Sequence, residues 1–264
     1  MVNWRLLELE TSNACRNMAI DESILVARTK GLAPDTLRFY RWRPSAVSIG
    51  RFQDLELEVQ LASCRNQGVD IVRRITGGGT VYHDAIGEIT YSAVVSKQDL
   101  GTSDIDKIYA RLYSGLVAAL KILGIITDFN EGNTKACPNL TTRGKKISGS
   151  AQTHKAGVVL QHGTLLSDVN LGKMFDVIRV PWAKTREEVI NIANDRITSI
   201  NSELGKRVSS AEVTDALVRG FSQALNVELV SDELTPYELD LAADLQEHKY
   251  ANDDWTFHCK SLPL

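Results

Sequence analysis

The segment Arg73-Arg74-Ile75-Thr76-Gly77-Gly78-Gly79-Thr80-Val81-Tyr82-His83-Asp84 carries the strongest structural signal in the sequence. It begins in one apolar run of strand-forming residues, 69–75, and is followed by another, 88–95. Three consecutive glycines after a strand let backbone N–H groups approach an anion without obstruction by Cβ atoms, and the two arginines supply positive charge. The spacing matches neither the Walker A loop nor the dinucleotide-binding glycine motif. Taken alone, the segment predicts either an anion-binding loop or a flexible hairpin turn.

A second cluster runs from Arg143 to Gln152 and combines Lys145 and Lys146 with small residues. Small residues permit close packing of a ligand against the backbone, and a lysine can neutralise phosphate and carboxylate groups together. The alternative is a solvated type I′ turn at Arg143-Gly144 with both lysines pointing outward. Because side chains alternate along a strand, the two lysines should face opposite sides, so at most one of them is naturally directed to solvent.

The remaining hydrophobic pattern predicts strands and helices in irregular alternation. Pro44 divides the β-forming run 36–50 into two short strands, and the apolar stripe of 105–123 predicts an amphipathic helix. Capping boxes that begin at Ser209 and Thr235 mark two C-terminal helices. Further strands are expected at 4–9, 69–75, 88–95 and 157–166, and further helices at 19–28 and 54–66. Several strand pairs are joined too briefly for a βαβ crossover, so the fold class is α+β, with a mixed, largely antiparallel sheet flanked by helices.

The composition excludes several broad classes of protein. The 264 residues carry a formal net charge of −3 and 43% of them are hydrophobic, so the sequence predicts neither a nucleic-acid binder nor a disordered chain. No run approaches the ~18 apolar residues of a membrane span, and the N-terminus lacks the pattern of a secretory signal. The cysteines form no C-x-x-C pair, which predicts reduced thiols in the cytoplasm rather than a zinc site; they are Cys15, Cys64, Cys137 and Cys259.

The two clusters and a third segment resemble the motifs of one enzyme family. RRITGGGTVYHD (73–84) resembles a signature of lipoate–protein ligases and their octanoyltransferase relatives. GKKISGSAQ (144–152) and LQHGTLL (160–166) resemble the family's lysine-bearing strand and the strand beside it. The similarity runs from about Leu6 to Trp255, so it covers most of the chain.

This resemblance implies a biotin/lipoate-ligase-like α+β fold. It further implies a single catalytic domain over 1–264, with the C-terminal helices of 208–249 as part of it. An accessory domain after the catalytic domain is expected to be absent.

The resemblance also implies a set of site residues. Lys146 matches the catalytic lysine, which contacts the acyl carbonyl and the α-phosphate. The positions that match the ATP or acyl-adenylate site are Arg74, Gly79, Thr80, Val81, Tyr82, Lys146 and Ala151. The positions around the lipoyl group are Gly77, Gly78, His83, His162 and Lys146. No metal ligand is expected: the alternative for both histidines is a hydrogen-bonded position in the sheet, and neither has a partner at metal-ligand spacing.

The activity that the resemblance implies is that of a lipoate–protein ligase. Such an enzyme activates lipoate with ATP and Mg²⁺ to lipoyl-AMP. It then transfers the lipoyl group to a lysine of a lipoyl carrier domain, of the glycine cleavage H protein or 2-oxoacid dehydrogenase E2 type. Lys146 and Arg74 would offset the repulsion between the carboxylate and the α-phosphate. The expected walls of the acyl tunnel are Val81, Val159 and Leu165, and a separate small accessory subunit is expected to complete the activation.

Two other functions stay open. An octanoyltransferase of the same family takes its acyl group from acyl carrier protein without ATP, and it uses a cysteine in the loop before the Gly-Lys turn. Cys137 lies in that loop, but it is only nine residues before Lys146 and its backbone is restricted by Pro138, so a bystander role is the other interpretation. The third function is that of a non-catalytic lipoate-binding subunit, which the complete set of Arg74, three glycines and Lys146 disfavours.

Overall fold

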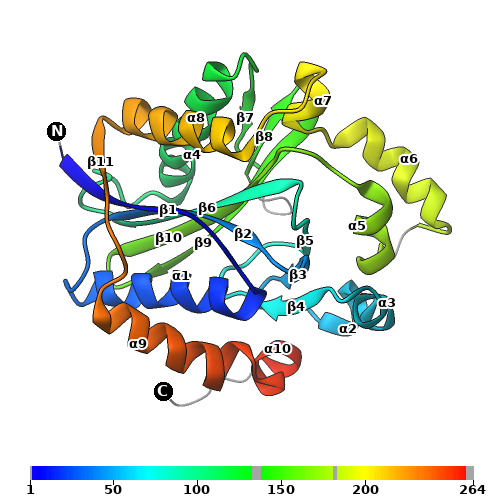
Figure 1. Cartoon of the computed structure of the whole chain (residues 1–264), viewed down its shortest axis with the longest axis horizontal. Coiled ribbons are helices and arrows are strands. Elements are labelled where there is room, and N and C mark those ends of the chain that lie inside the picture. Colours follow the sequence, from blue (N-terminus) through cyan, green and yellow to red (C-terminus); the bar gives the residue numbers. More distant parts are fainter. Residues whose placement is uncertain (1, 133–137, 181–182, 260–264) are drawn as a thin grey trace.

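The computed structural model describes residues 2–132, 138–180 and 183–259, which form an eight-stranded sheet at the centre of the molecule (Figure 1). The strands in spatial order are β11 (Val227–Ser231), β1 (Val2–Ser12), β2 (Thr36–Trp42), β6 (Glu88–Ser96), β10 (Val158–Leu166), β9 (Lys145–Lys155), β8 (Asn139–Thr142) and β7 (Asp128–Asn130). β1 is parallel to both of its neighbours, and the other pairs of this sheet are antiparallel. The expectation of a mixed, largely antiparallel sheet flanked by helices is confirmed.

A small second sheet lies beside the large one. It consists of β4 (Asp70–Arg73), β3 (Ala46–Ile49) and β5 (Val81–His83), with β3 in the middle. The chain leaves the large sheet after β2 and enters the small sheet at β3, and Pro44 separates the two strands as the sequence predicted. Residues 74–80, which we call the glycine segment, therefore connect β4 to β5, close to the junction of the two sheets.

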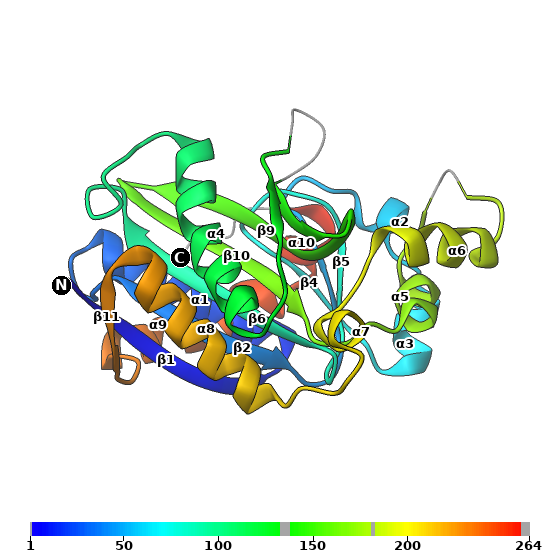
Figure 2. The same cartoon turned by 90° about the horizontal axis from the view of Figure 1, so that it is seen from above.

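Helices cover both faces of the large sheet. α4 (Ile105–Ile122) and α8 (Ser210–Leu225) pack side by side on one face, and α1 (Ala14–Thr29) covers the other with α9 (Pro236–Leu245) outside it (Figures 1 and 2). Alternate strand residues divide between the two hydrophobic cores: Phe39 belongs to the core under α4 and α8, whereas Tyr40 belongs to the core around α1. This alternation decides which side chains can reach a site on the α1 face.

Three predicted helices begin close to the positions that the sequence indicated. The capping boxes at Ser209 and Thr235 are both formed and begin α8 and α9. The predicted helix over 105–123 is α4, with Asp104 as its N-cap. α1 begins earlier than the sequence predicted, because the Asn13 side chain accepts a hydrogen bond from the Arg16 N–H and caps the helix ahead of Ala14.

The single helix predicted over 54–66 is wrong. The structure has two short helices there, α2 (Leu55–Glu58) and α3 (Leu61–Gln67). Val59 instead forms a β-bridge with Ile178, and the Gln60 N–H donates to the Val177 carbonyl. These long-range partners interrupt the helix, and local sequence periodicity does not contain them.

The other helices were not predicted. They are α5 (Leu171–Val177), α6 (Arg186–Arg196), α7 (Ile200–Leu204), the π-helical turn η1 (Gln246–Tyr250) and α10 (Asp253–His258). α2, α3, α5 and α6 gather at one end of the molecule, beside the small sheet (Figure 2). Within the described ranges, no helix has the length and apolar character needed to cross a membrane.

A buried arginine attaches the C-terminal helix to the small sheet. Arg73, 1% exposed, donates hydrogen bonds to two groups of backbone carbonyls. One group ends α10 and the other lies in the loop after β3; the acceptors are Trp255, Thr256 and Phe257, and Gly50, Arg51 and Gln53. The Trp255 indole N–H returns a bond of 2.8 Å to the Arg73 carbonyl, so α10 and β4 hold each other in place.

Candidate active site

A cavity of about 230 Å³ lies where the small sheet, the α1 face of the large sheet and α5 meet. Most of the predicted site residues line it: Arg74, Gly78, Gly79, Thr80, Val81, Tyr82, His83, Lys146, Ala151 and His162. Met18 of α1 and Tyr40 and Trp42 of β2 add walls that the sequence did not indicate. The segments 73–84 and 144–166, identified from the sequence alone, therefore converge on one cavity.

Three predicted residues do not line this cavity. Gly77 lies in the glycine segment, but its contribution is a carbonyl that accepts a hydrogen bond from Arg74 at 2.8 Å. Val159 and Leu165 were expected as tunnel walls, and this prediction is wrong because both pack into the core under α4 and α8. Side chains of β10 alternate, so residues an odd number of positions from His162 must face the opposite side of the sheet.

The two neighbouring lysines separate as the alternation predicted. The Lys145 ammonium donates to the Asn194 carbonyl at 2.6 Å and does not line the cavity, whereas Lys146 does. Arg143 and Gly144 both have positive φ angles, of 50° and 78°, as a type I′ turn requires. The Lys146 side chain extends over Gly149: a Cβ atom at that glycine would lie 2.7 Å from both Lys146 Cε and Nζ. The absence of a side chain at Gly149 is what leaves room for the ammonium.

Arg74 is buried, and its guanidinium donates hydrogen bonds to neighbouring groups of the protein. Its five N–H groups make five hydrogen bonds, to the Ser48 carbonyl and hydroxyl, the Thr76 hydroxyl and the carbonyls of Gly77 and Gly79. These bonds span 2.7–3.1 Å and hold the segment in a fixed shape against β3. Arg74 thus positions the loop, and a direct contact with a nucleotide stays a prediction.

A chain of hydrogen bonds leads from Arg74 to Glu88, and we call it the His83 chain: Ser48, His83 and Glu88. The Ser48 hydroxyl lies 2.8 Å from His83 Nε2, and His83 Nδ1 lies 2.7 Å from Glu88 Oε1. Because a carboxylate only accepts, Nδ1 carries the proton and Nε2 of the neutral ring accepts from the serine hydroxyl. The Trp42 ring stacks on the imidazole with centroids 3.9 Å apart, which fixes the plane of His83.

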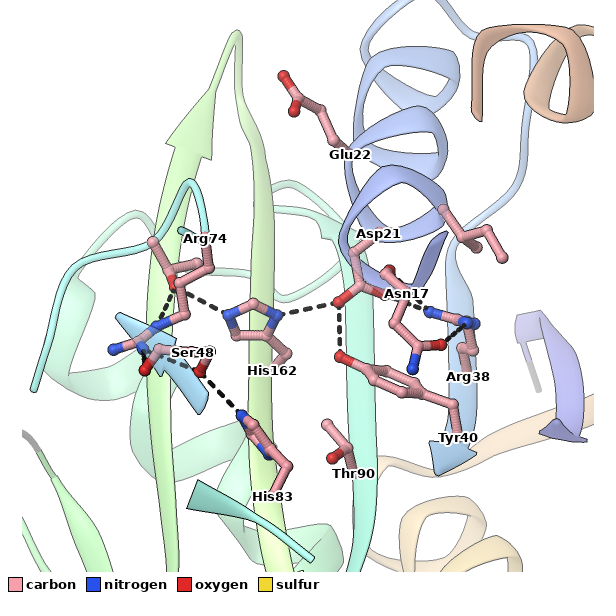
Figure 3. A network of polar contacts seen from close by, with 12 residues as sticks. Asn17, Asp21, Glu22, Arg38, Tyr40, Ser48, Arg74, His83, Thr90 and His162 are labelled. Carbon is pink, nitrogen blue, oxygen red and sulfur yellow. Dashed lines mark hydrogen bonds and ion pairs between the residues drawn. The ribbon is translucent and has the colours of Figure 1, made fainter. Parts of the chain in front are cut away.

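A second chain leaves Arg74 in the other direction, and we call it the His162 chain: Thr76, His162 and Asp21. The Thr76 hydroxyl lies 2.8 Å from His162 Nε2, and His162 Nδ1 lies 2.9 Å from Asp21 Oδ2. Burial lowers the pKa of His162, although the hydrogen bond and charge of Asp21 act against it. Figure 3 shows His162 between the Arg74 side of the site and Asp21, with Tyr40 and Arg38 beyond.

Asp21 is a well-satisfied buried carboxylate. Arg38 donates to its Oδ1 at 2.9 Å, and the Tyr40 hydroxyl donates to Oδ2 at 2.9 Å (Figure 3). Burial by itself raises the pKa of the Asp21 carboxyl, but the hydrogen bond from His162 and the charge of Arg38 outweigh burial and hold it below its usual range. Asp21 therefore stays ionised and fixes the orientation of His162.

The sequence did not indicate Ser48, Thr76, Asp21 or Glu88 as site residues. Thr76 lies within the glycine segment and could have been included by position. Asp21 and Ser48 stand in an ordinary helix and an ordinary strand, and only the fold brings them to the histidines. A buried acid in the middle of α1 carries no local sequence signal.

Three of the four cysteines, Cys15, Cys64 and Cys259, lie within the described residues, and all three are free thiols. Cys137 lies outside the described residues. Burial raises the pKa of both the Cys15 and the Cys64 thiol to about 11, which makes a nucleophilic thiolate unfavourable at either position.

The model of the lipoyl protein ligase A/B catalytic domain matches residues 13–222 of this chain. The chain belongs to this family. Its relatives include octanoyltransferase LipM of Clostridioides difficile (strain 630), which is 36% identical to this chain in sequence, over 97% of this chain and 98% of the relative. Octanoyltransferase LipM of Bacillus subtilis (strain 168) is 32% identical, over 96% and 98%.

Solved structures of the family share the fold along the whole chain. A bi-partite lipoate protein ligase from Thermoplasma acidophilum matches with a TM-score of 0.89 and 32% identity, over 100% of both chains. A lipoate-protein ligase A bound with ATP matches with a TM-score of 0.85 and 32% identity, over 97% of this chain and 99% of the other. The chain is therefore an enzyme of the lipoylation and octanoyl-transfer family, with the ligase-like fold that its motifs implied.

Proposed function

We propose that this chain is an octanoyltransferase, which moves an octanoyl group from acyl carrier protein to a lysine of a lipoyl carrier domain. The observation that carries this proposal is the full-length similarity, at 32–38% identity, to relatives named octanoyltransferase LipM. The acceptors are lipoyl domains of the H protein or E2 type. The sequence motifs led us to expect a lipoate–protein ligase first, and this proposal replaces that expectation with the octanoyltransferase that was its alternative.

The cavity suits a medium-length acyl chain with one polar end. Its apolar walls come from Met18, Trp42 and Val81, and its volume of about 230 Å³ is below the ~300–1,000 Å³ of sites for larger ligands. Lys146 lines the same cavity beside Gly149. A fixed ammonium there would stabilise negative charge on the acyl carbonyl oxygen as the tetrahedral intermediate forms.

The bonds of Arg74 count against a nucleotide in this role. All five of its N–H donors are bonded to acceptors of the protein itself, so a phosphate could bind the guanidinium only by displacing part of the glycine segment. A thioester donor requires no such contact, because the leaving group is a thiolate rather than pyrophosphate. Because a thioester is already activated for acyl transfer, the proposed reaction uses neither ATP nor Mg²⁺.

The reaction would proceed in two transfers if Cys137 is the nucleophile. Its thiolate would attack the octanoyl thioester of acyl carrier protein, and the lysine of the lipoyl domain would then attack the thioester formed on Cys137. The test is intact mass spectrometry of the chain after incubation with octanoyl-acyl carrier protein and no acceptor. We expect a mass increase of one octanoyl group in the parent chain and none in Cys137→Ser. Transfer at the parent rate by Cys137→Ser would contradict this route.

A lipoate–protein ligase is the second candidate, and the match to the bi-partite ligase favours it. In that case Lys146 would contact the acyl-adenylate, and a separate small subunit would complete the activation. The discriminating measurement is pyrophosphate release from ATP, Mg²⁺ and lipoate by the purified chain, with lipoyl transfer from pre-made lipoyl-AMP assayed in parallel. Rapid reaction in both assays would replace the octanoyltransferase proposal.

A further inference from the structure

The His83 chain and the His162 chain contain the same order of groups: carboxylate, imidazole, hydroxyl and then Arg74. Figure 3 shows the Ser48–His83 contact of the first chain and the His162–Asp21 contact of the second. They differ at the hydroxyl end. Both residues are buried, Ser48 at 2% and Thr76 at 0% exposure, but Ser48 is among the residues that line the cavity and Thr76 is not. A bound substrate could therefore exchange a proton with the hydroxyl of the His83 chain but not with that of the His162 chain.

The two chains also differ at the carboxylate end. The negative charge of Asp21 is already balanced by Arg38, which donates to it at 2.9 Å. Glu88 is 1% exposed, and within the described part of the chain His83 is the one basic side chain that contacts it. Its Oε1 also accepts from Thr90 at 2.9 Å, but its Oε2 has no hydrogen-bond partner there. A buried, incompletely satisfied carboxylate stabilises positive charge on the imidazole that it touches, as in the hydrolase triads.

The proposed octanoyl transfer contains a step that needs such a group. When a lysine amine attacks an acyl carbon, its nitrogen gains positive charge and must lose a proton before the amide is formed. Neither ring nitrogen of His83 is free to take that proton directly, because both are already hydrogen-bonded. The Ser48 hydroxyl, 2.8 Å from Nε2, can take it while passing its own proton to the ring.

We propose that the His83 chain removes the proton from the attacking lysine amine of the lipoyl domain, through the Ser48 hydroxyl. This inference rests on the proposed octanoyl transfer. The C–N bond forms, the amine proton moves to Ser48 Oγ, and the Ser48 proton moves to His83 Nε2. The C–S bond of the thioester breaks with its electron pair on sulfur. The thiolate then receives the proton back through Ser48, so the products are an amide and a thiol.

Charged and titratable side chains surround the His83 chain. The charged or titratable groups that face it are Arg74 after β4, His162 of β10, Tyr40 of β2 and Tyr82 of β5. Burial raises the pKa of Tyr82 to about 12 and that of Tyr40 well above its ordinary value, and the guanidinium stays charged. The two tyrosines and the guanidinium therefore keep their protonation state between pH 5 and 9, so a pH profile of transfer in that range does not report on them.

The first test is a single-turnover assay of octanoyl transfer to an apo lipoyl domain by Ser48→Ala and Ser48→Thr. Removing the hydroxyl should lower the transfer rate about 10²-fold, while Ser48→Thr, which keeps it, should recover most of the rate. Acylation of the chain by the octanoyl donor without acceptor is measured in parallel, and the proposal predicts that Ser48→Ala lowers transfer to the amine more than it lowers this acylation. Equal transfer rates in Ser48→Ala and the parent would overturn the proposal. A parent chain that fails to use the octanoyl donor would instead refute the octanoyltransferase function.

The second test is rescue by added imidazole. His83→Gly leaves a gap under the Trp42 ring, between Ser48 and Glu88, that imidazole can fill. We expect imidazole to restore transfer by this variant, with a rate that follows the titration of imidazole.

The matched control is Thr76→Val, which removes the hydroxyl of the His162 chain at nearly constant volume. It should destabilise the glycine segment, yet its transfer rate should keep the pH profile of the parent and should not respond to imidazole. If imidazole fails to restore transfer by His83→Gly, or if it raises transfer by Thr76→Val to the same extent, the His83 chain only supports the fold.

Discussion

Lys146 and Gly149 form one functional unit, because the glycine provides the space through which the lysine reaches the cavity. The ammonium belongs to a side chain with four rotatable bonds, so it needs a fixed surface to hold it near an acyl carbonyl. The strand that carries both residues is anchored on either side, by β8 and β10. Rigid backbone under a flexible side chain is the arrangement that positions charge for catalysis.

Lys146→Ala should lower kcat for acyl transfer about 10²–10³-fold, because it removes the donor aimed at the developing oxyanion. Lys145→Ala is the matched control: its ammonium points away from the cavity toward Asn194, so its kcat should stay close to that of the parent. Steady-state transfer to a lipoyl domain measures both. Equal losses in the two variants would contradict the assignment.

Gly149→Ala should reduce transfer without unfolding the protein. The new Cβ would lie 2.7 Å from the far end of Lys146, which can move away at small cost. A displaced ammonium lowers the rate, by up to about 10²-fold for a shift near 1 Å. A thermal melt should change little while kcat falls; a large fall in melting temperature with normal kcat would show that Gly149 has another role.

His162 should make the protein less stable in mild acid. Its pKa is lowered by burial, so below the unfolded-state value of about 6.5 the unfolded chain binds a proton that the folded chain does not. Stability is then lost as the pH falls through that value, by up to about 1 kcal/mol between pH 7 and 5.5. Urea denaturation at both pH values should show a smaller pH effect in His162→Gln than in the parent.

Asp35 provides a control of opposite sign. Burial raises the pKa of its carboxyl to about 6, so the folded state holds this proton more tightly than the unfolded state. Its contribution to stability is present at low pH and is lost as the pH rises through about 6. Asp35→Asn should therefore enlarge the loss of stability on acidification, whereas His162→Gln should reduce it. A shared direction in the two variants would contradict the account of His162.

At the scale of elements, helices with strong local signals were predicted correctly. The helix that was predicted wrongly is one that long-range contacts interrupt. The capping boxes at Ser209 and Thr235 and the stripe of α4 are contained in a few neighbouring residues, and each element formed where it was predicted. α2 and α3 were predicted as one helix because the bridge from Val59 to Ile178 crosses more than a hundred residues. Val159 and Leu165 were predicted as cavity walls, but each lies three positions from His162 on β10. Side-chain alternation along the strand therefore places both on the face opposite the cavity.

Arg73 should be a determinant of stability because it joins two elements far apart in the chain. Arg73→Met would leave the carbonyls at the end of α10 and in the loop after β3 without their donor. At about 1–3 kcal/mol per unsatisfied buried group, we expect a loss above about 3 kcal/mol in chemical denaturation. The control is Arg219→Ala on the exposed face of α8, which should change stability by less than about 0.5 kcal/mol. A mild effect of Arg73→Met would mean that α10 is held by Trp255 packing alone.

For the whole molecule, the site lies at the junction of the two sheets and draws on segments from Met18 of α1 to Ile197, which follows α6. The sequence motifs supplied the loop and the lysine, and these were predicted because each is contiguous in the chain. Asp21, Ser48 and Glu88 could not be predicted, because they meet the histidines only after β2, β3, β6 and β10 have been arranged. The same reasoning explains why motif residues identified the family while leaving the choice between two of its reactions open.

That choice is tested most directly by the mass of an apo lipoyl domain after incubation with the purified chain. One mixture contains octanoyl-acyl carrier protein, with nucleotides removed and a metal chelator present. The other contains lipoate, ATP and Mg²⁺ without a thioester donor. We predict that the domain gains one octanoyl group in the first mixture and nothing in the second. A lipoyl group added in the second mixture, with no change in the first, would contradict the account.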